Sequence, residues 1–410
     1  MADVIRAFDY EKDLADVKRI WKEVGWAVED NEIAQLDHFF AVGRTWVAQV
    51  HGRIECSVHT VPADMQIHQT RLPMLAVTAV TTSHLGRGRA FAQRLTAQQL
   101  LQGQKAGAAL SALGMFDQGF YDKLGFGTGG YEQQFSFDPA QLLVRFPKRP
   151  AIRLTLADSE EMHACLLTRQ RQHGSVSLHP PLLLRSELGF DEKGFGLGFR
   201  SDEGELTHFL WLDPKDSAEH GPHTVRYLAY REGPQLLELL GLLKSLSDQI
   251  YSVNLIEPAG CQLQVMLERP LRHQDLSQGG KFESRISSLA WWQARILDLA
   301  PCVEALAGAS GEVSFEVELT DPLTAYDSQG GVAGQWHIQL GPNASAQPCG
   351  TGSTGLPILK ATVNTLTRLL LGVAPPSGLA LTDGLIGDMG FLQELDLAMQ
   401  VHAPVIGWDF

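Results

Sequence analysis

The order of strands and helices expected along this chain occurs twice, and this repeat constrains the fold more than any other feature. Hydrophobic periodicity predicts strand, helix, hairpin, strand, helix and strand between residues 4 and 137, and the same order again between residues 151 and 258. In the first stretch, residues 72–83 are a near-continuous apolar and β-branched run, typical of a buried strand. The sequence therefore predicts two related α/β units.

Two breaks divide the chain. The first is "RFPKRP" at 145–150, with two prolines and three basic residues, and the second is "HQDLSQGGKFES" at 273–284. After the second break, residues 312–319 and 333–341 are predicted strands, and residues 358–372 and 389–400 are predicted helices. We expect α/β units at 1–145 and 150–275 and an α+β domain at 285–410.

Charge and cysteine content narrow the class of protein. The formal net charge is −14, whereas proteins that bind nucleic acid have a basic footprint. The five cysteines form no CxxC pair and indicate reduced thiols, and the fourteen histidines show no HExxH or other paired metal spacing. The first residues resemble no signal peptide, and no apolar run approaches the roughly 18–20 residues of a membrane span. We expect a cytoplasmic protein with no metal, nucleic-acid or membrane partner.

The junction after the strand at 72–83 is the best candidate for a binding site. The segment "HLGRG" brings Gly86 and Gly88 to a helix predicted from about Arg89. Glycines allow a tight turn, unpaired N–H groups of a first helical turn bind anions, and arginines pair with phosphate. A lone junction of this kind is more often a simple connection, and this junction has neither the GxxxxGK[ST] nor the GxGxxG spacing.

This junction, followed about thirty residues later by "FYDKLGFG" at 120–127, resembles the GCN5-related N-acetyltransferase (GNAT) fold. The family's phosphate loop, R/Q-x-x-G-x-G/A, corresponds to residues 85–90, with Leu85 where Arg or Gln is usual. The resemblance implies acetyl-CoA as co-substrate. It implies that the pantetheine arm pairs with the backbone of Thr78, Ala79 and Val80. The remaining coenzyme contacts it implies are Gly86, Arg87, Gly88, Arg89, Ala90, Phe91, Phe116 and Asp117.

Over nearly its whole length the chain resembles the enhanced intracellular survival (Eis) type acetyltransferases. The supporting segments are "VTAVTTSHLGRG", "FYDKLGFG", "WWQARILDLAPCVEAL" and the last residues, "PVIGWDF". The resemblance implies two tandem GNAT domains, the second degenerate, then a sterol-carrier-like domain, assembled as a homohexamer. It implies that the α-carboxylate of Phe410 accepts a proton from the substrate amine and that Tyr121 donates one to the departing thiolate.

The acceptor is expected to be a small cationic amine, since the family resemblance implies aminoglycosides, other polyamines or lysine side chains. Glu29, Asp30 and Asp409 are candidate contacts for its ammonium group. For Tyr121 the alternative is a packed turn residue, and for Phe410 it is a terminus that is merely packed down.

We call the anion-binding turn expected at residues 86–91 the cradle. The corresponding junction of the second unit, "RYLAYREGPQLL", lacks such a cradle. Glu232 would repel phosphate and Pro234 has no N–H group, so acetyl-CoA is expected at the first unit only. The leading hypothesis is an N-acetyltransferase that transfers acetyl directly to a primary amine. The alternative is an acyl-CoA-sensing protein that binds a lipid or acyl chain without acetyl transfer. The cradle and Tyr121 together favour the enzyme.

Overall fold

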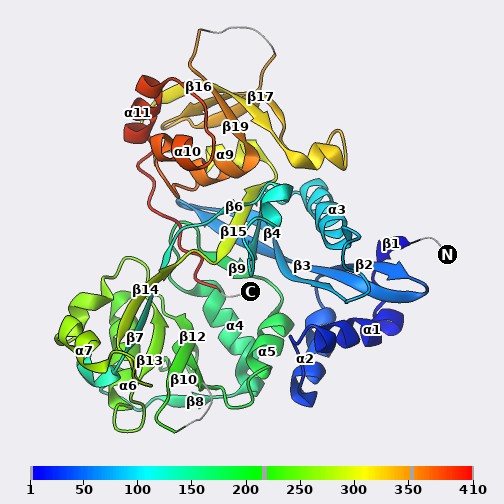
Figure 1. Ribbon diagram of the computed structural model, residues 1–410. Helices are drawn as coiled ribbons and strands as arrows, with labels where there is room; N and C mark the ends of the chain where they lie inside the picture. The colour runs from blue at the N-terminus through cyan, green and yellow to red at the C-terminus, as the bar shows by residue number, and fades with distance from the viewer. Residues whose placement is uncertain (1–2, 215–218, 351–354, 409–410) are drawn as a thin grey trace.

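The computed structural model describes residues 3–214, 219–350 and 355–408, whose strands form three sheets (Figure 1). The first sheet has, in spatial order, β1 (Val4–Ala7), β2 (Arg44–Val50), β3 (Arg53–Ile67), β4 (Thr70–Thr82), β5 (Leu110–Gly114), β15 (Trp292–Ile296) and β6 (Gly127–Thr128), with β9 (Val176–Leu178) paired to β3. The second has β14 (Arg285–Leu289), β7 (Glu132–Phe137), β13 (Val253–Ile256), β12 (His223–Ala229), β11 (Leu206–Pro214), β10 (Phe195–Arg200) and β8 (Ile152–Leu154). The third has β18 (Ser345–Pro348), β17 (Gly334–Leu340), β16 (Val313–Thr320) and β19 (Ile358–Thr362).

Helices follow the same three-part division. In the first part they are α1 (Tyr10–Glu23), α2 (Asp30–Phe40), α3 (Phe91–Lys105) and the 3-10 helices η1 (Tyr121–Leu124) and η2 (Pro139–Gln141). In the second they are η3 (Leu156–Asp158), α4 (Ser159–Thr168), α5 (Pro181–Gly189), α6 (Gly233–Ser245), η4 (Leu263–Met266) and α7 (Pro270–Ser277). In the third they are α8 (Leu299–Glu304), η5 (Pro322–Ala325), α9 (Val363–Leu370), α10 (Pro376–Thr382) and α11 (Met389–Ala398).

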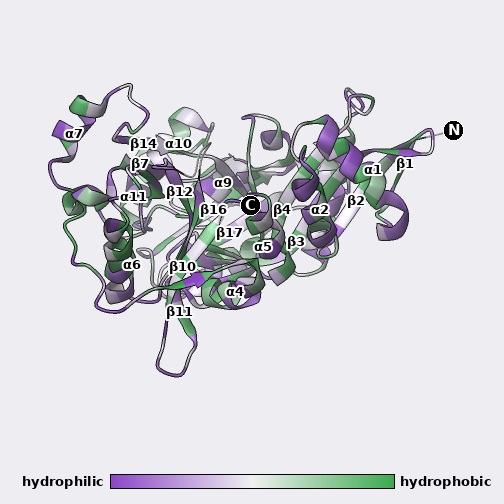
Figure 2. Cartoon of the chain, turned by 90° about the horizontal axis from the view of Figure 1, so that it is seen from below, coloured by the Kyte–Doolittle hydropathy of each residue, from purple (hydrophilic) through white to green (hydrophobic). Residues whose placement is uncertain are grey.

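Most helices bury one face against a sheet. Helix α6 carries both hydrophobic and hydrophilic residues (Figure 2). All of its leucines except the exposed Leu237 lie in the core of the second unit, while Glu238 pairs with Arg149. None of the described helices is both long and apolar enough to cross a bilayer.

The two α/β units share one topology, which confirms the prediction of two related units. Each has a single parallel pair next to a run of antiparallel strands, namely β4 with β5 and β12 with β13. Each also has a register shift on the other side of that pair, at Thr78 in β4 and at Arg226 in β12. The first unit has two helices after its first strand, α1 and α2. The second unit also has two, α4 and α5, and periodicity did not predict α5.

The sheets are interleaved along the sequence. Strand β7, within residues 1–145, pairs with β13 in the second sheet, where Phe137 lies opposite Val253. Strand β15, within residues 285–410, pairs with β5 on one side and with β6 on the other in the first sheet. Figure 1 shows it next to β6. Each unit therefore depends on a strand that lies outside its predicted range.

One predicted helix is wrong at its start. Residues 358–362 are the strand β19, parallel to β16, and only residues 363–370 are helical. In this strand Leu359 and Ala361 are buried while their neighbours are exposed, which is the two-residue period of a strand. The helix begins where Thr362 accepts a hydrogen bond from the Thr365 N–H group.

Candidate active site

Strands β4 and β5 diverge, and the divergence opens the first candidate site. Their parallel pairing ends where Val77 lies opposite Leu113. Immediately afterwards the pairing of β4 with β3 shifts register, so Thr78 is an extra residue without an opposite partner. A bulge of this kind bends a strand and increases its twist. From residue 78 onward the β5 side of β4 is a free strand edge, the arrangement that an added extended chain requires.

A cavity of about 500 Å³ fills the space between the end of β4, the start of α3 and the segment after β5. This volume lies in the usual range for small-molecule pockets. Of the residues predicted to contact a coenzyme, those that line it are Val80, Gly86, Arg87, Gly88, Ala90, Phe91, Phe116 and Asp117. Thr78, Ala79 and Arg89 do not line it. The structure thus brings together the strand, cradle and loop that the sequence analysis singled out separately.

The N-terminus of α3 points unpaired donors at this cavity. The first hydrogen bond of the helix joins the Arg94 N–H group to the Ala90 carbonyl at 3.0 Å. The N–H groups of Phe91, Ala92 and Gln93 therefore have no intrahelical partner, and the helix dipole adds positive potential at the same end. A phosphate or pyrophosphate group fits this position.

The two glycines of the cradle have different roles. A Cβ atom on Gly86 would lie 2.5 Å from the carbonyl oxygen of Glu55, so Gly86 is required by close packing against β3. Gly88 has a φ of +75° and would meet nothing within 4 Å. At Gly88 the missing side chain leaves open space at the cavity wall, where a ligand can approach the backbone.

The two arginines of the cradle also differ. Arg87 lines the cavity, whereas the Arg89 guanidinium turns away and pairs with Asp3 at 3.0 Å. Only Arg87 is therefore placed to meet an anionic ligand through its side chain.

Tyr121 begins the short helix η1, next to the cavity. Its side chain is only 3% exposed and packs edge-on against the rings of Phe116, Phe120 and Phe126. Phe116 and Phe120 are themselves cavity-lining residues. Burial raises the pKa of Tyr121 above its ordinary value, so the phenol keeps its proton at neutral pH and can act only as a donor of that proton.

Comparison with known proteins agrees with this geometry. Residues 5–129 match the family model described as an acetyltransferase (GNAT) domain. This chain carries a GNAT acetyltransferase domain. It is therefore an acyltransferase, and GNAT enzymes use acetyl-CoA as the acetyl donor. No curated protein matches the chain.

Solved structures with the same three-part fold are similar over the whole chain. A probable N-acyltransferase of unknown function from Enterococcus faecalis V583 is 19% identical, with a TM-score of 0.78 and complete coverage of both chains. A GCN5-related N-acetyltransferase from Anabaena variabilis is 16% identical, also with a TM-score of 0.78 and complete coverage of both. Eis1 from Mycobacterium abscessus is 17% identical, with a TM-score of 0.74 and complete coverage of both. At these identities the likeness shows the fold alone.

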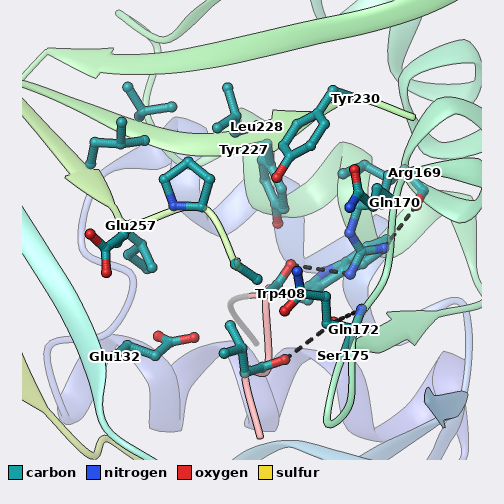
Figure 3. Close-up of a pocket in the computed structure, with 18 of the residues that line it drawn as sticks. Glu132, Arg169, Gln170, Gln172, Ser175, Tyr227, Leu228, Tyr230, Glu257 and Trp408 are labelled. Atoms are coloured by element: carbon teal, nitrogen blue, oxygen red, sulfur yellow. Dashed lines mark hydrogen bonds between the residues drawn. The ribbon is translucent and has the colours of Figure 1, made fainter. Parts of the chain in front are cut away.

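A second, smaller cavity lies at the equivalent divergence of the second unit, outside the GNAT domain. Pairing of β12 with β13 ends at Thr224 and Asn254, and the cavity beyond has a volume of about 120 Å³. Figure 3 shows the carboxylates of Glu132 and Glu257 on one side of it, with Tyr227 and Tyr230 above and Arg169 on the far side. Sequence reasoning missed these residues because they come from separate strands and loops of two units.

Arg169 is a buried cation in the wall of the second cavity. Its guanidinium donates to the carbonyl oxygens of Leu166, Val176 and Gly407 and to the Ser177 hydroxyl. Burial lowers its pKa to about 9. These acceptors satisfy the guanidinium, and the bond to Gly407 links the segment before the last residues to the second unit.

The segment before the last two residues is firmly anchored. The Val405 N–H group donates to the His173 carbonyl, and the Ile406 carbonyl accepts from Val176. Ile406 and Trp408 are buried, at 0% and 3% exposure. Asp409 and Phe410, which carry two of the predicted roles, lie outside the described residues.

Trp291 connects the two cavities. Its indole N–H donates to the Glu132 carboxylate in the second cavity. Its carbonyl accepts from the Met115 N–H group at 2.8 Å, and the next residue, Phe116, lines the first cavity. A short stretch of backbone therefore separates the two sites.

Glu29 and Asp30 occupy the N-terminus of α2. The Glu29 carboxylate caps this helix in a reciprocal arrangement with Glu32. Both residues are exposed, and neither lines either of the two cavities in the described part of the chain.

Proposed function

We propose that this chain transfers the acetyl group of acetyl-CoA, bound at the first unit, directly to a primary amine of a small cationic acceptor. The observation that carries the proposal is that one cavity is bordered by the free edge of β4, the N-terminus of α3 and the aromatic segment around Tyr121. These are the parts needed to hold an extended thiol arm, an anionic group and a proton donor.

The residues around the first cavity have separate roles in binding acetyl-CoA and in the transfer. N–H groups from Gly88 to Gln93 and the side chain of Arg87 hold the pyrophosphate, and the edge of β4 from Thr78 to Val80 holds the pantetheine arm. The amine attacks the acetyl carbonyl, so a C–N bond forms while the C–S bond breaks. Tyr121 donates its phenolic proton to the departing sulfur. Holding both reactants side by side supplies most of the rate.

The proton that the amine loses requires a base, and we propose the α-carboxylate of Phe410. Support comes from Ile406 and Trp408, whose burial holds the preceding segment beside the second cavity. A free α-carboxyl has a pKa of roughly 3.3–3.7 and is a weak base, and apolar surroundings would raise that value.

We propose that the acceptor's ammonium groups bind in the second cavity, between Glu132 and Glu257. Carboxylates attract cations, and the ring of Tyr230 offers a cation–π surface. The rings of Tyr227 and Trp408 already pack against Arg226 and Arg169. One Glu257 oxygen accepts from the Leu263 N–H group at 2.7 Å, which fixes the side chain. Glu132 and Glu257 are proposed in addition to the three ammonium contacts predicted from the sequence, which are Glu29, Asp30 and Asp409.

Gly88→Val should weaken acetyl-CoA binding by at least about tenfold, because a branched side chain would occupy the space in which the pyrophosphate approaches the backbone. Gly107→Val is the matched control. Gly107 also has a positive φ, +89°, and also faces open space, but it lies at the other end of α3. Acetyl-CoA affinity should be measured for both variants; equal weakening in both would assign the effect to backbone strain.

Glu257→Gln should raise the KM for a polyamine by about tenfold, the loss of one charge-assisted contact, while leaving the KM for acetyl-CoA unchanged. The glutamine retains the acceptor oxygen for Leu263. Glu268→Gln, at an exposed glutamate of the same unit, is the control. An unchanged polyamine KM in Glu257→Gln would remove the acceptor from this cavity.

The overall proposal is tested by incubating the purified protein with acetyl-CoA and a panel of polyamines and aminoglycosides. We expect free CoA and a singly acetylated amine to appear in equal amounts. Binding of acyl-CoA without release of CoA from any acceptor would favour the acyl-sensing alternative. A sterol-carrier-like role for residues 285–410 and assembly into hexamers stay predictions.

A further inference from the structure

The helix that carries Tyr121 is too short to fix its own position. Helix η1 has four residues, and a 3-10 turn of this length has poor hydrogen-bond geometry and little intrinsic stability. A proton donor, by contrast, must stay within a fraction of an ångström of its productive position. The contacts that hold η1 therefore matter to the reaction.

Those contacts come from β15 and α9, which lie far from η1 in the sequence. The Asn364 side-chain amide, on α9, donates to the carbonyl oxygens of Asp122 and Phe126 at 3.0 and 2.8 Å. The Gln293 amide, on β15, donates to the Asp122 carboxylate at 2.7 Å. These bonds hold both ends of the turn that begins at Tyr121.

A buried ion pair reinforces the same turn. Arg295 is 0% exposed and donates to the carbonyl oxygen of Leu124, the last residue of η1. It also pairs with the buried Asp321 of the third domain at 2.7 Å. The Asp321 carboxylate in turn accepts from the Leu323 and Val332 N–H groups at 2.9 Å each. All of these groups are satisfied, which makes the arrangement rigid.

The backbone that follows η1 packs closely against α9. Gly125, directly after η1, has a φ of +85°, and a Cβ atom there would lie 2.5 Å from a methyl group of Val363. A Cβ atom on Gly127 would lie 2.6 Å from the Asn364 carbonyl oxygen. Two glycines thus allow the turn to pack backbone-close against the third domain.

We propose that β15 and α9 position the proton donor, with Asn364 and Gln293 as positioning residues for Tyr121. This inference rests on the proposed acid role of Tyr121. It gives the third domain a part in the chemistry of the first unit: it holds η1 so that the phenol faces the leaving sulfur.

The test compares Asn364→Ala and Gln293→Leu with Gln104→Ala, because replacing Arg295 or Asp321 would leave a buried charge and risk unfolding. Gln104 also joins the first unit to the third domain, through hydrogen bonds to Leu297 and Gly331, and none of these bonds goes to η1. We expect about a 10- to 100-fold fall in kcat for the first two variants, with an unchanged KM for acetyl-CoA. Gln104→Ala should retain the wild-type kcat.

The same substitutions are then repeated in a Tyr121→Phe background. If Asn364 acts through Tyr121, Asn364→Ala should cause no further loss there, because residues that act as a unit are non-additive. An equal loss in both backgrounds, or an equal loss in Gln104→Ala, would overturn the positioning role. An inactive Tyr121→Phe with a fully active Asn364→Ala would overturn positioning alone, whereas a fully active Tyr121→Phe would overturn the acid role and the inference with it.

Discussion

Tyr121→Phe should retain acetyl-CoA binding and lower turnover by about 10²–10⁴-fold, the usual contribution of a general acid. The substitution removes one hydroxyl and keeps the ring, so the packing against Phe116, Phe120 and Phe126 is preserved. Burial raises the Tyr121 pKa and keeps the phenol protonated, so the wild type always has a proton to give.

The matched control for this variant is Tyr131→Phe, since Tyr131 is 71% exposed and lies outside both cavities. Steady-state rates and acetyl-CoA affinity should be measured for both proteins. Unchanged turnover in Tyr121→Phe, with acetyl transfer verified in the product, would reduce Tyr121 to a packing residue.

An extension after Phe410, or deletion of Phe410, should lower amine acetylation by about 10²-fold or more if its α-carboxylate is the base. An extension converts that carboxylate into an uncharged amide and moves the new carboxylate away. The melting temperature should change little, because Ile406 and Trp408 remain to anchor the segment.

The comparison protein carries the same extension ahead of Met1 and should be fully active. Rates and melting temperatures of the two extended forms are measured side by side. Full activity with the extension after Phe410 would contradict the base role of its α-carboxylate and leave the segment "PVIGWDF" with a packing role only.

Local sequence signals predicted the parts of the first cavity well. The helix predicted from about Arg89 begins at Phe91, and the glycine cradle and the segment of Tyr121 meet at one cavity. Such features are encoded by a few consecutive residues, so periodicity and turn residues suffice to find them.

Pairing between strands that are distant in the sequence could not be predicted from local patterns. No local pattern states that β15 inserts between β5 and β6, or that β7 joins the second sheet. For this reason Glu132 and Gln293, which lie on these strands, were not recognised as site or positioning residues. The wrong helix at 358–362 has a related cause, since the strand is stabilised by pairing with β16, which is more than thirty residues away.

The second unit keeps the strand divergence and the register shift but not the cradle. Its helix α6 begins at Gly233, with the exposed Glu232 before it and Pro234 at the second position. The cavity at its divergence is also bordered by Val405 and Trp408. A negative charge, a missing N–H group and a neighbouring segment all oppose coenzyme binding there.

The central claim is that acetyl-CoA binds once per chain, at the cavity between β4 and α3, and calorimetric titration tests it most directly. Wild-type protein should bind one molecule of acetyl-CoA per chain, and Gly88→Val should reduce that affinity while Gly107→Val does not. Two equivalent sites per chain, or undiminished binding in Gly88→Val, would contradict the account.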